Sequence, residues 1–202
     1  MSARRLNPNA YEAFASLMDR RGLERQRRRV GSSAAGVVLE IGVGTGRNLP
    51  HFTAATRIVG VDPHPEMLTM AAARARDLPW PVDLVVGSAE SLPFRPASFD
   101  TVVITLTLCT VSDPAAAIAE VRRVLAAYGT LIFLEHERSR STAVARLQDL
   151  ATPLWSRVSG GCHLNRSTVA TIRDAGFDIT ESWRARHGRS GLVQGTATVA
   201  RG

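Results

Sequence analysis

The sequence predicts a single-domain α/β protein with an open, twisted and mostly parallel sheet, an antiparallel edge and helices on both faces. Short apolar runs alternate with helical segments along most of the 202 residues. This alternation is typical of parallel sheets that are covered on both faces. Apolar residues make up 45% of the chain, which is enough for one sizeable core and argues against disorder.

Seven strands are expected, and the first five are short runs rich in Val, Ile and Leu. Turn residues separate these runs from the helical segments. The last two strands can pair antiparallel at the sheet edge. The expected strands are 36–42, 57–62, 82–88, 99–109, 129–137, 177–184 and 193–200.

The helices are indicated by apolar periodicity and by their end signals. The first begins near Pro8, and Gly22 breaks or bends it. Asp113 precedes Pro114 as a helix cap, and Asn165 or Ser167 can cap the last helix. We therefore divide the chain into an N-terminal helical lid or arm and a main α/β domain, residues 1–33 and 34–202. The other expected helices are 46–55, 64–76, 114–127, 143–158 and 167–175.

All basic residues of the chain are arginine, and the formal net charge is +7. The densest group of arginines lies in residues 20–29. A solvated helix face is the simplest interpretation, and contact with an anionic membrane surface is the alternative. No aromatic residue lies in this segment, which argues against a stacking platform for nucleic acid. The oligomeric state is not predicted.

The sequence contains no run of roughly 20 apolar residues that could span a membrane. Its first residues lack a hydrophobic signal region. We therefore expect a cytoplasmic protein, with peripheral membrane contact through residues 20–29 as the alternative. Cys109 and Cys162 are too few for a disulfide framework and are not spaced as metal ligands. We expect free thiols and no metal.

The strongest chemical signal is the segment VVLEIGVGTGRNL, in which a strand runs into Gly42, Gly44 and Gly46. Ligands of open α/β sheets bind at the carboxyl ends of the strands, where this loop must lie. A dinucleotide-binding loop that starts at Gly42 would need its third glycine at position 47, which is Arg47. The loop therefore indicates a different ligand.

Two carboxylates indicate which ligand it is. Glu40 lies at the end of the strand that enters the loop, where it repels a pyrophosphate but suits an ammonium group. Asp62 ends the next strand, 22 residues later, where it can accept hydrogen bonds from ribose hydroxyls. S-adenosylmethionine carries an ammonium and a ribose but no phosphate.

Four motifs in this order resemble those of class I S-adenosylmethionine-dependent methyltransferases of the type 11 group, over about residues 34–137. They are E-x-G-x-G-x-G from Glu40, VGVDPHPEML, GSAESLPF and FDTVVITLTLC. The segments TLTLCTVSDP, FLEH and GCHLNRSTVATIRDAGF are similar to thiol S-methyltransferase-like and phospholipid N-methyltransferase-like members. Membrane-attached members of the thiol group carry an apolar N-terminal anchor, which this sequence lacks.

The resemblance implies a Rossmann-like fold and S-adenosyl-L-methionine as cofactor, with S-adenosyl-L-homocysteine as product. It implies in-line methyl transfer to a small-molecule nucleophile, with a thiol or an amine favoured. Core packing is the alternative role for Met67 and Leu106, and family members often have aspartate in place of Ser88. The implied cofactor-binding residues are Glu40, Gly42, Gly44, Thr45, Gly46, Asn48, Asp62, His64, Met67, Ser88, Ala89, Glu90, Thr105 and Leu106.

The acceptor pocket must lie past the same edge of the sheet. His136 is the candidate base, because an imidazole titrates near neutral pH, and His163 is a second candidate. A nucleophilic Cys162–His163 pair is not expected, since methyl transfer needs no covalent enzyme intermediate. This loop instead predicts a glycine-hinged helix entrance that borders the pocket. The candidate pocket residues are Tyr11, Cys109, His136, Trp155, Cys162 and His163.

Three other functions remain open on the sequence. The first is methylation of phospholipid or quinone headgroups at a membrane surface, to which residues 20–29 would contribute. RNA methylation is suggested by charge alone. The third is a non-catalytic S-adenosylmethionine-binding regulator, which a blocked acceptor pocket would favour.

Overall fold

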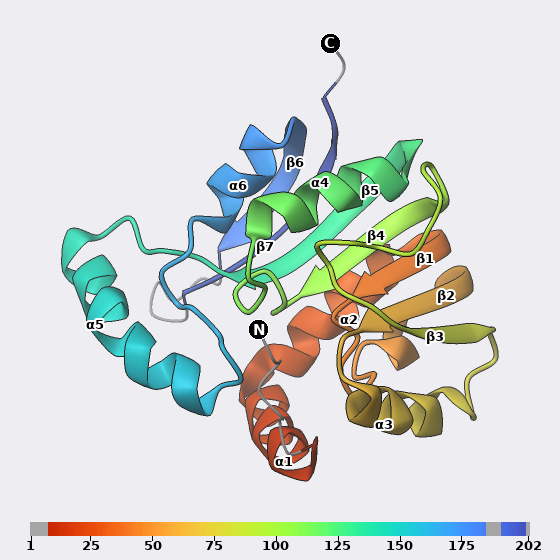
Figure 1. The fold of residues 1–202 in the computed structure, drawn as a ribbon, viewed down its shortest axis with the longest axis horizontal. Coiled ribbons are helices and arrows are strands. Elements are labelled where there is room, and N and C mark those ends of the chain that lie inside the picture. Colours follow the sequence, from red (N-terminus) through yellow and green to blue (C-terminus); the bar gives the residue numbers. More distant parts are fainter. Residues whose placement is uncertain (1–7, 185–190, 201–202) are drawn as a thin grey trace.

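A seven-stranded sheet forms the centre of the protein (Figure 1). The computed structural model describes residues 8–184 and 191–200. The strand order is β3-β2-β1-β4-β5-β7-β6, with β7 antiparallel to both of its neighbours and the other pairs parallel. The predicted fold class is confirmed. The strands are β1 (Ala35–Ile41), β2 (Ala54–Asp62), β3 (Val82–Val86), β4 (Phe99–Thr105), β5 (Leu125–His136), β6 (Phe177–Arg184) and β7 (Leu192–Val199).

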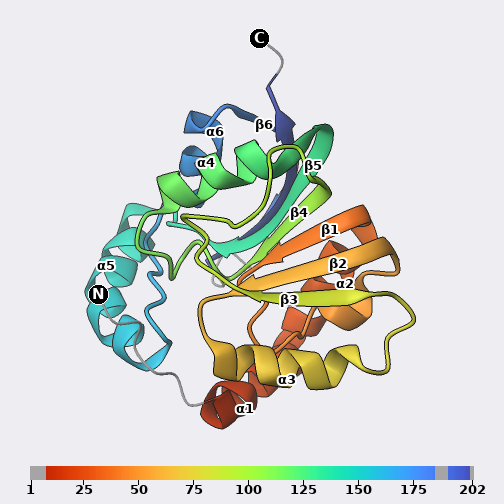
Figure 2. The ribbon, with the colours of Figure 1, turned by 45° about the vertical axis from the view of Figure 1, so that its right-hand side comes forward.

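Helices cover both faces of this sheet (Figures 1 and 2). α4 and α6 pack on one face, and α2 and α3 pack on the other. α1 and α5 lie on the side of the sheet toward which β4 points. The helices are α1 (Pro8–Met18), the π-helical turn η1 (Asp19–Leu23), α2 (Glu24–Ser33), the 3₁₀ turn η2 (Leu49–His51), α3 (Pro65–Ala75), α4 (Pro114–Val124), α5 (Thr142–Val158) and α6 (Thr168–Asp174).

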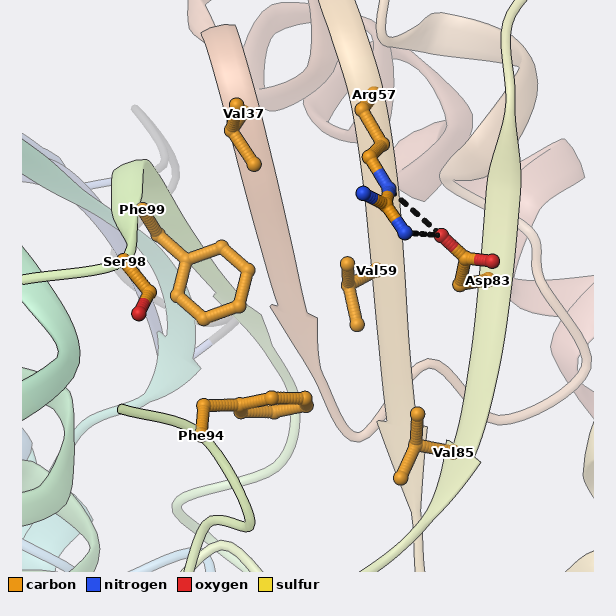
Figure 3. Close-up of a pocket in the computed structure, with 8 residues that line it drawn as sticks. All are labelled: Val37, Arg57, Val59, Asp83, Val85, Phe94, Ser98 and Phe99. Atoms are coloured by element: carbon orange, nitrogen blue, oxygen red, sulfur yellow. Dashed lines mark hydrogen bonds and ion pairs between the residues drawn. The ribbon is translucent and has the colours of Figure 1, made fainter. Parts of the chain in front are cut away.

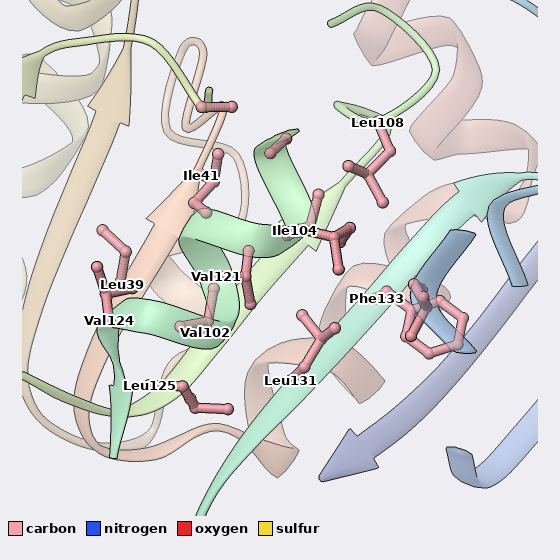
Figure 4. Close-up of a cluster of buried hydrophobic side chains, with 14 of the residues drawn as sticks. Leu39, Ile41, Val102, Ile104, Leu108, Val121, Val124, Leu125, Leu131 and Phe133 are labelled. Atoms are coloured by element: carbon pink, nitrogen blue, oxygen red, sulfur yellow. The ribbon is translucent and has the colours of Figure 1, made fainter. Parts of the chain in front are cut away.

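Alternation along the strands divides the core between the two faces. Leu39 and Ile41 of β1 belong to the cluster that packs under α4, where Val121 is fully buried (Figure 4). Val38 of the same strand belongs to the opposite cluster, together with Val30 of α2. Successive side chains of a strand point to opposite faces, so a strand buried on both faces reads as a continuous apolar run.

The helix expected over residues 46–55 does not form. Only the short turn η2 is present there. Gly46 has a left-handed φ of +81°, and Pro50 lacks the N–H that a helix starting at the loop would need. The chain therefore crosses to β2 almost without helix, and α2 from the N-terminal segment covers this part of the face.

Several element boundaries also differ from the expected ones. The strand expected over 99–109 ends at Thr105, because Leu106 turns away with a φ of +54°. The helix expected over 114–127 ends at Val124, and β5 begins at the next residue. The loop from Leu106 to Asp113 is consequently free to carry side chains past the carboxyl edge of the sheet.

The helix caps agree with the sequence in one case and not in the other. Asp113 accepts hydrogen bonds from the N–H groups of Ala115 and Ala116, as expected, at 3.0 Å each. Ser167 makes no side-chain cap bond. Glu137 instead accepts a hydrogen bond from the N–H of Val169, at 3.1 Å. A carboxylate from β5's end thus stabilises the start of α6.

A cavity of about 300 Å³ lies on the α4 face of the sheet (Figure 3). It exists because residues 87–98 cross from β3 to β4 without forming a helix. Its lining is largely apolar, and none of the predicted site residues lines it. The lining residues are Val37, Arg57, Val59, Asp83, Val85, Phe94, Ser98 and Phe99.

Candidate active site

The glycine loop follows β1 and lies directly against the loop after β4. Gly42 has a φ of +70°, and a Cβ atom there would stand 2.1 Å from Oγ1 of Thr107. A side chain is therefore excluded by backbone conformation and by space. At Gly44 a Cβ atom would make only ordinary van der Waals contacts, with the carbonyl oxygen of Gly42 and the hydroxyl of Tyr11 each at 3.9 Å. The loop thus presents bare backbone to a ligand and lies beneath the first helix.

Glu40 is the buried carboxylate at the end of β1, and one of its oxygens has no partner. Its Oε1 accepts a hydrogen bond from Nδ2 of Asn48 at 2.7 Å, while Oε2 is unpaired within the described residues. Burial raises the pKa of Glu40 to about 8. An unpaired buried carboxylate oxygen is costly. An ammonium group would satisfy it, so this site fits the amino acid end of S-adenosylmethionine.

Asn48 connects that carboxylate to the N-terminal helices. Its Nδ2 also donates to Oγ1 of Thr105 at 3.0 Å, and its Oδ1 accepts a hydrogen bond from Arg27 at 3.0 Å. Arg27 in turn pairs with Asp19 at 3.0 Å, and both side chains are buried. Arg27 thus differs from its exposed neighbours in the arginine-rich segment, for which a solvated face was expected.

Glu12 holds α1 on the glycine loop. It accepts a hydrogen bond from Thr45 at 2.7 Å and pairs with Arg47 at 2.8 Å. Arg74 of α3 also pairs with it. Burial alone would raise the pKa of Glu12, but the hydrogen bonds from Arg74 and Thr45 lower it on balance. Three elements therefore meet at one carboxylate beside the cofactor loop.

Asp62, at the end of β2, is already anchored by backbone. It accepts hydrogen bonds from the N–H groups of Gly44 and His64, at 3.0 and 2.9 Å. Nδ1 of His64 lies 3.1 Å from the same carboxylate. This fixes the orientation of Asp62 before a ribose arrives. Met67 of α3 is 2% exposed, which agrees with its alternative role in the core.

The predicted adenine edge is a tight turn after β3. Ser88 donates to the carboxylate of Glu90, which also accepts a hydrogen bond from the N–H of Ser112 at 2.9 Å. Ala89 is buried. The turn therefore packs against the loop that follows β4. Leu106, in that loop, is partly buried against the core cluster that contains Val38.

The loop after β4 is organised by Glu135, which sequence reasoning did not select. This fully buried carboxylate accepts hydrogen bonds from the N–H groups of Thr107, Leu108 and Cys109, at 2.6, 2.9 and 3.3 Å. Burial raises its pKa to about 7, although these hydrogen bonds act in the opposite direction. Glu135 thereby fixes the position of Cys109.

Cys109, His136 and Cys162 come together past the ends of β4 and β5. The sulfur of Cys162 lies 3.3 Å from the sulfur of Cys109 and 3.3 Å from Nδ1 of His136. Both cysteines are buried. The hydrogen bond from Cys109 and the neighbouring His136 lower the pKa of Cys162 to about 5. The pKa of Cys109 is raised, first by its hydrogen bond to Cys162 and then by burial.

His136 is part of this cluster, so its predicted role as a base changes. Burial alone would lower its pKa, but Cys162 and Glu135 raise it on balance. Nδ1 of His136 is engaged by the sulfur of Cys162, so it is not available to take a proton from an acceptor. His163 faces elsewhere: its Nδ1 lies 3.2 Å from the carbonyl oxygen of Cys109. The adjacent Cys162 and His163 therefore have different partners.

The other predicted pocket residues border the same region. Trp155 of α5 stacks edge-on against Phe14 of α1, with ring centroids 6.1 Å apart. Its indole also lowers the pKa of Cys162. Burial raises the pKa of Tyr11, and the charges of both Asp62 and Cys109 add to that increase. Tyr11 thus lies within electrostatic reach of both the cofactor side and the cysteine cluster.

The comparisons with known proteins agree with this geometry. Residues 39–133 match the family model described as a methyltransferase domain. The chain is 31% identical over 188 residues to thiol S-methyltransferase TMT1B of Rattus norvegicus, across 91% of this chain and 73% of that protein. The chain belongs to the S-adenosylmethionine-dependent methyltransferases. Its cofactor is therefore S-adenosylmethionine, as the unpaired oxygen of Glu40 indicates.

Two further relatives of this methyltransferase differ in the acceptor that their names give. Thiol S-methyltransferase TMT1A of Homo sapiens is 31% identical over 69% of this chain and 59% of its own length. Phosphatidylethanolamine N-methyltransferase of Cereibacter sphaeroides is 33% identical over 52% of this chain and 53% of its own length. The family is shared, whereas the acceptor is not.

Solved structures support the fold of this methyltransferase. One, described as a possible histamine N-methyltransferase from Thermotoga maritima, superposes with a TM-score of 0.66 at 24% identity, covering 94% of this chain and 98% of that one. The [4+2]-cyclase SpnF gives 0.70 at 22% identity, with 88% and 82% covered. Among the described residues, no helix is both long and apolar enough to cross a bilayer.

Proposed function

We propose that this methyltransferase transfers the methyl group to the sulfur of a small-molecule thiol. The observation that carries the proposal is the group of Cys109, His136 and Cys162 beside the cofactor loop. Thr107, two residues before Cys109, lies against Gly42 of that loop. The similarity to two proteins named thiol S-methyltransferase supports it. S-adenosylmethionine, when bound, supplies an electrophilic methyl that needs no activation by the protein.

The residues of this chain would orient and enclose the reactants. Glu40 holds the ammonium of the cofactor, and Asp62 its ribose. Tyr11 on α1 covers the glycine loop, which supports a lid role for residues 1–33 in excluding water. A thiol with a pKa of about 8.5 is already partly ionised at neutral pH, so it needs little help from a base. The engagement of His136 with the sulfur of Cys162, which keeps Nδ1 from serving as a base, is thus compatible with a thiol acceptor.

A methyl-transfer screen tests the proposal. The full chain is incubated with methyl-labelled S-adenosylmethionine and with small thiols, amines, phenols, RNA or phosphatidylethanolamine vesicles. Labelled thioether is the expected product, and Asp62→Ala should abolish both cofactor binding and labelling. Labelling of amines, phenols, RNA or lipid without labelling of thiols would contradict the proposal. Cofactor binding with no labelled acceptor of any class would favour the regulator.

A lipid headgroup is the second candidate acceptor, favoured by an apolar stripe on α5. Leu147, Leu150 and Leu154 are 65%, 79% and 68% exposed, and they repeat at helical spacing. Exposed leucines in a row are unusual on a free surface. Together with the exposed arginines of residues 20–29, they would suit an anionic membrane surface. Labelling of phosphatidylethanolamine that Leu150→Ser reduces would support this candidate over the thiol.

A further inference from the structure

The cysteine and histidine cluster has the composition of a metal site. Cys109, His136 and Cys162 each offer one ligand atom, and these three atoms lie within 4.8 Å of one another. Two sulfurs and one imidazole are the ligands that zinc prefers, and three protein ligands with one open position are typical of catalytic zinc. These residues are 27 and 26 positions apart along the chain, which is not a metal-binding spacing, so the sequence predicted no metal.

The distances are close to those that zinc requires. Zn–S bonds of about 2.3 Å and Zn–N bonds of about 2.0–2.1 Å in a tetrahedron place two sulfurs about 3.8 Å apart, and a sulfur and a nitrogen about 3.6 Å apart. The observed separations are 3.3 Å for the two sulfurs and 3.3 Å between Cys162 and His136. Outward shifts of a few tenths of an ångström would admit the ion.

Hydrogen bonds other than the contacts among the three ligands hold their backbone in place. Glu135 fixes the loop of Cys109, as described above. The hydroxyl of Thr168 donates to the carbonyl oxygen of His136 at 2.9 Å. The N–H of His163, next to Cys162, donates to the carbonyl oxygen of Cys109 at 2.8 Å. Ligands held by separate hydrogen bonds do not depend on contact between the sulfurs, and this preorganisation favours binding.

Charge also favours a divalent ion at this position. Both cysteines of the cluster are buried, so a bound ion whose charge is not matched by its ligands would be costly there. A Zn²⁺ ion with two thiolates is neutral overall.

We propose that Cys109, His136 and Cys162 bind one zinc ion whose fourth coordination position receives the sulfur of the acceptor thiol. The role of the fourth position rests on the proposed thiol acceptor, whereas zinc binding itself does not. Zinc would lower the pKa of a bound thiol, so the thiol would lose its proton to solvent and form the new S–CH3 bond as a thiolate. The bond from the methyl group to the sulfonium sulfur would break at the same time, and S-adenosylhomocysteine would leave with that electron pair.

The metal site is tested on the full chain, reduced with a phosphine and stripped with a chelator. After addition of Zn²⁺ and gel filtration, about one zinc per chain should remain. Co²⁺ in its place should give the charge-transfer absorption of two cobalt–thiolate bonds, which requires no variant. Cys162→Ser and His136→Gln should weaken zinc binding by roughly 100-fold or more. His163→Gln, which changes the neighbouring histidine, should retain the metal.

Far-UV circular dichroism and S-adenosylmethionine binding show whether each variant is folded. The site is overturned if the reduced wild-type chain retains no zinc, or if Cys162→Ser and His136→Gln retain as much as wild type. It is also overturned if Co²⁺ gives no thiolate absorption. A Cys109–Cys162 disulfide that forms in air, in a chain that binds no zinc when reduced, would show a redox pair instead.

A second measurement separates the role of the metal from the proposed function. Benzyl mercaptan should change the Co²⁺ spectrum, and its methylation should fall at least about tenfold in the stripped chain and return with Zn²⁺. Equal thiol methylation with and without zinc would overturn the role of the metal and leave the proposed function standing. Zinc binding with methylation of amines alone would overturn the thiol acceptor and leave the metal site standing.

Discussion

The cofactor end of the site and its acceptor end differ in how their polar groups are satisfied. At the cofactor end, Glu40, Asn48 and Arg27 form a continuous buried network that leaves one carboxylate oxygen unpaired. At the proposed acceptor end, the sulfur of Cys162 contacts the sulfur of Cys109 and Nδ1 of His136. The first end thus leaves a buried charged group for a ligand to satisfy, whereas the polar atoms of the second end contact one another.

The largest expected effect concerns the network at the cofactor end. Arg27→Ala removes one of the two arginines that pair with buried Asp19, leaving Arg47, and also leaves Oδ1 of Asn48 without its donor, so it should lower the free energy of unfolding by about 3 kcal/mol. Arg28→Ala is the matched control, because its exposed pair with Glu24 contributes at most about 0.5 kcal/mol. Urea unfolding measures both. Equal losses would show that the buried network is no more important than the solvated face.

The next effect concerns the close approach of the two loops. Gly42→Ala places a Cβ atom against Thr107 in a left-handed conformation, and should cost at least about 2 kcal/mol of stability and weaken cofactor binding. Gly22 also has a positive φ, +113°, but nothing lies near the position of its Cβ atom. Gly22→Ala should therefore cost about 1 kcal/mol of stability and leave cofactor binding unchanged. Thermal unfolding and calorimetry compare the two. Similar behaviour of both variants would contradict the tight contact.

Glu40→Gln tests the unpaired oxygen directly. The amide keeps the shape of the side chain but loses the charge that would meet the ammonium, so S-adenosylmethionine binding should weaken by about 10–100-fold. Glu66→Gln, on the first turn of α3, is a control outside the network. If Glu40→Gln binds the cofactor as tightly as wild type, the assignment of Glu40 to the ammonium is wrong.

The pH dependence of cofactor binding follows from the same residue. Burial raises the pKa of Glu40 to about 8 in the ligand-free chain, so the carboxyl is protonated at neutral pH and must lose that proton to meet an ammonium. Its contribution to stability is complete below about pH 4.5 and is lost as pH rises through about 8. Affinity for S-adenosylmethionine should rise by up to about tenfold between about pH 6 and about pH 7.

Calorimetry in buffers with different heats of ionisation should detect the released proton. In Glu40→Gln this proton release should disappear. Glu135, whose pKa is about 7, is unchanged in that variant. An affinity that does not change with pH in the wild-type chain would show that Glu40 is ionised before the cofactor binds.

The smallest effect is expected at the acceptor end, for the histidine that lies outside the cluster. His163→Gln should change kcat for thiol methylation by less than about threefold, because the imidazole of His163 only meets the carbonyl of Cys109. Cofactor affinity should be unchanged. A loss of several hundredfold in kcat, with unchanged cofactor binding, would show that His163 takes part in catalysis. It would contradict the conclusion that only His136 belongs to the functional cluster.

The sequence by itself determined the sheet, its antiparallel edge and the ligand at the glycine loop. These depend on local signals: apolar runs, glycines where no side chain fits, and the carboxylates Glu40 and Asp62 at strand ends. Each of these signals is contained in a short stretch of sequence, so it can be recognised without knowing which distant residues it contacts. The helix expected over 46–55 was wrong, because Gly46 and Pro50 oppose helix at the position where the motif favours it.

Only the tertiary structure decided which side chains meet. Arg27 became a buried partner of Asn48 while the other arginines of residues 20–29 stayed exposed, and its partner lies 21 residues further along the chain. Cys162 lies beside His136 rather than in a pair with His163 because the loop after α5 returns to the ends of β4 and β5. Contacts between distant segments depend on how strands and loops pack, which local residue preferences do not fix.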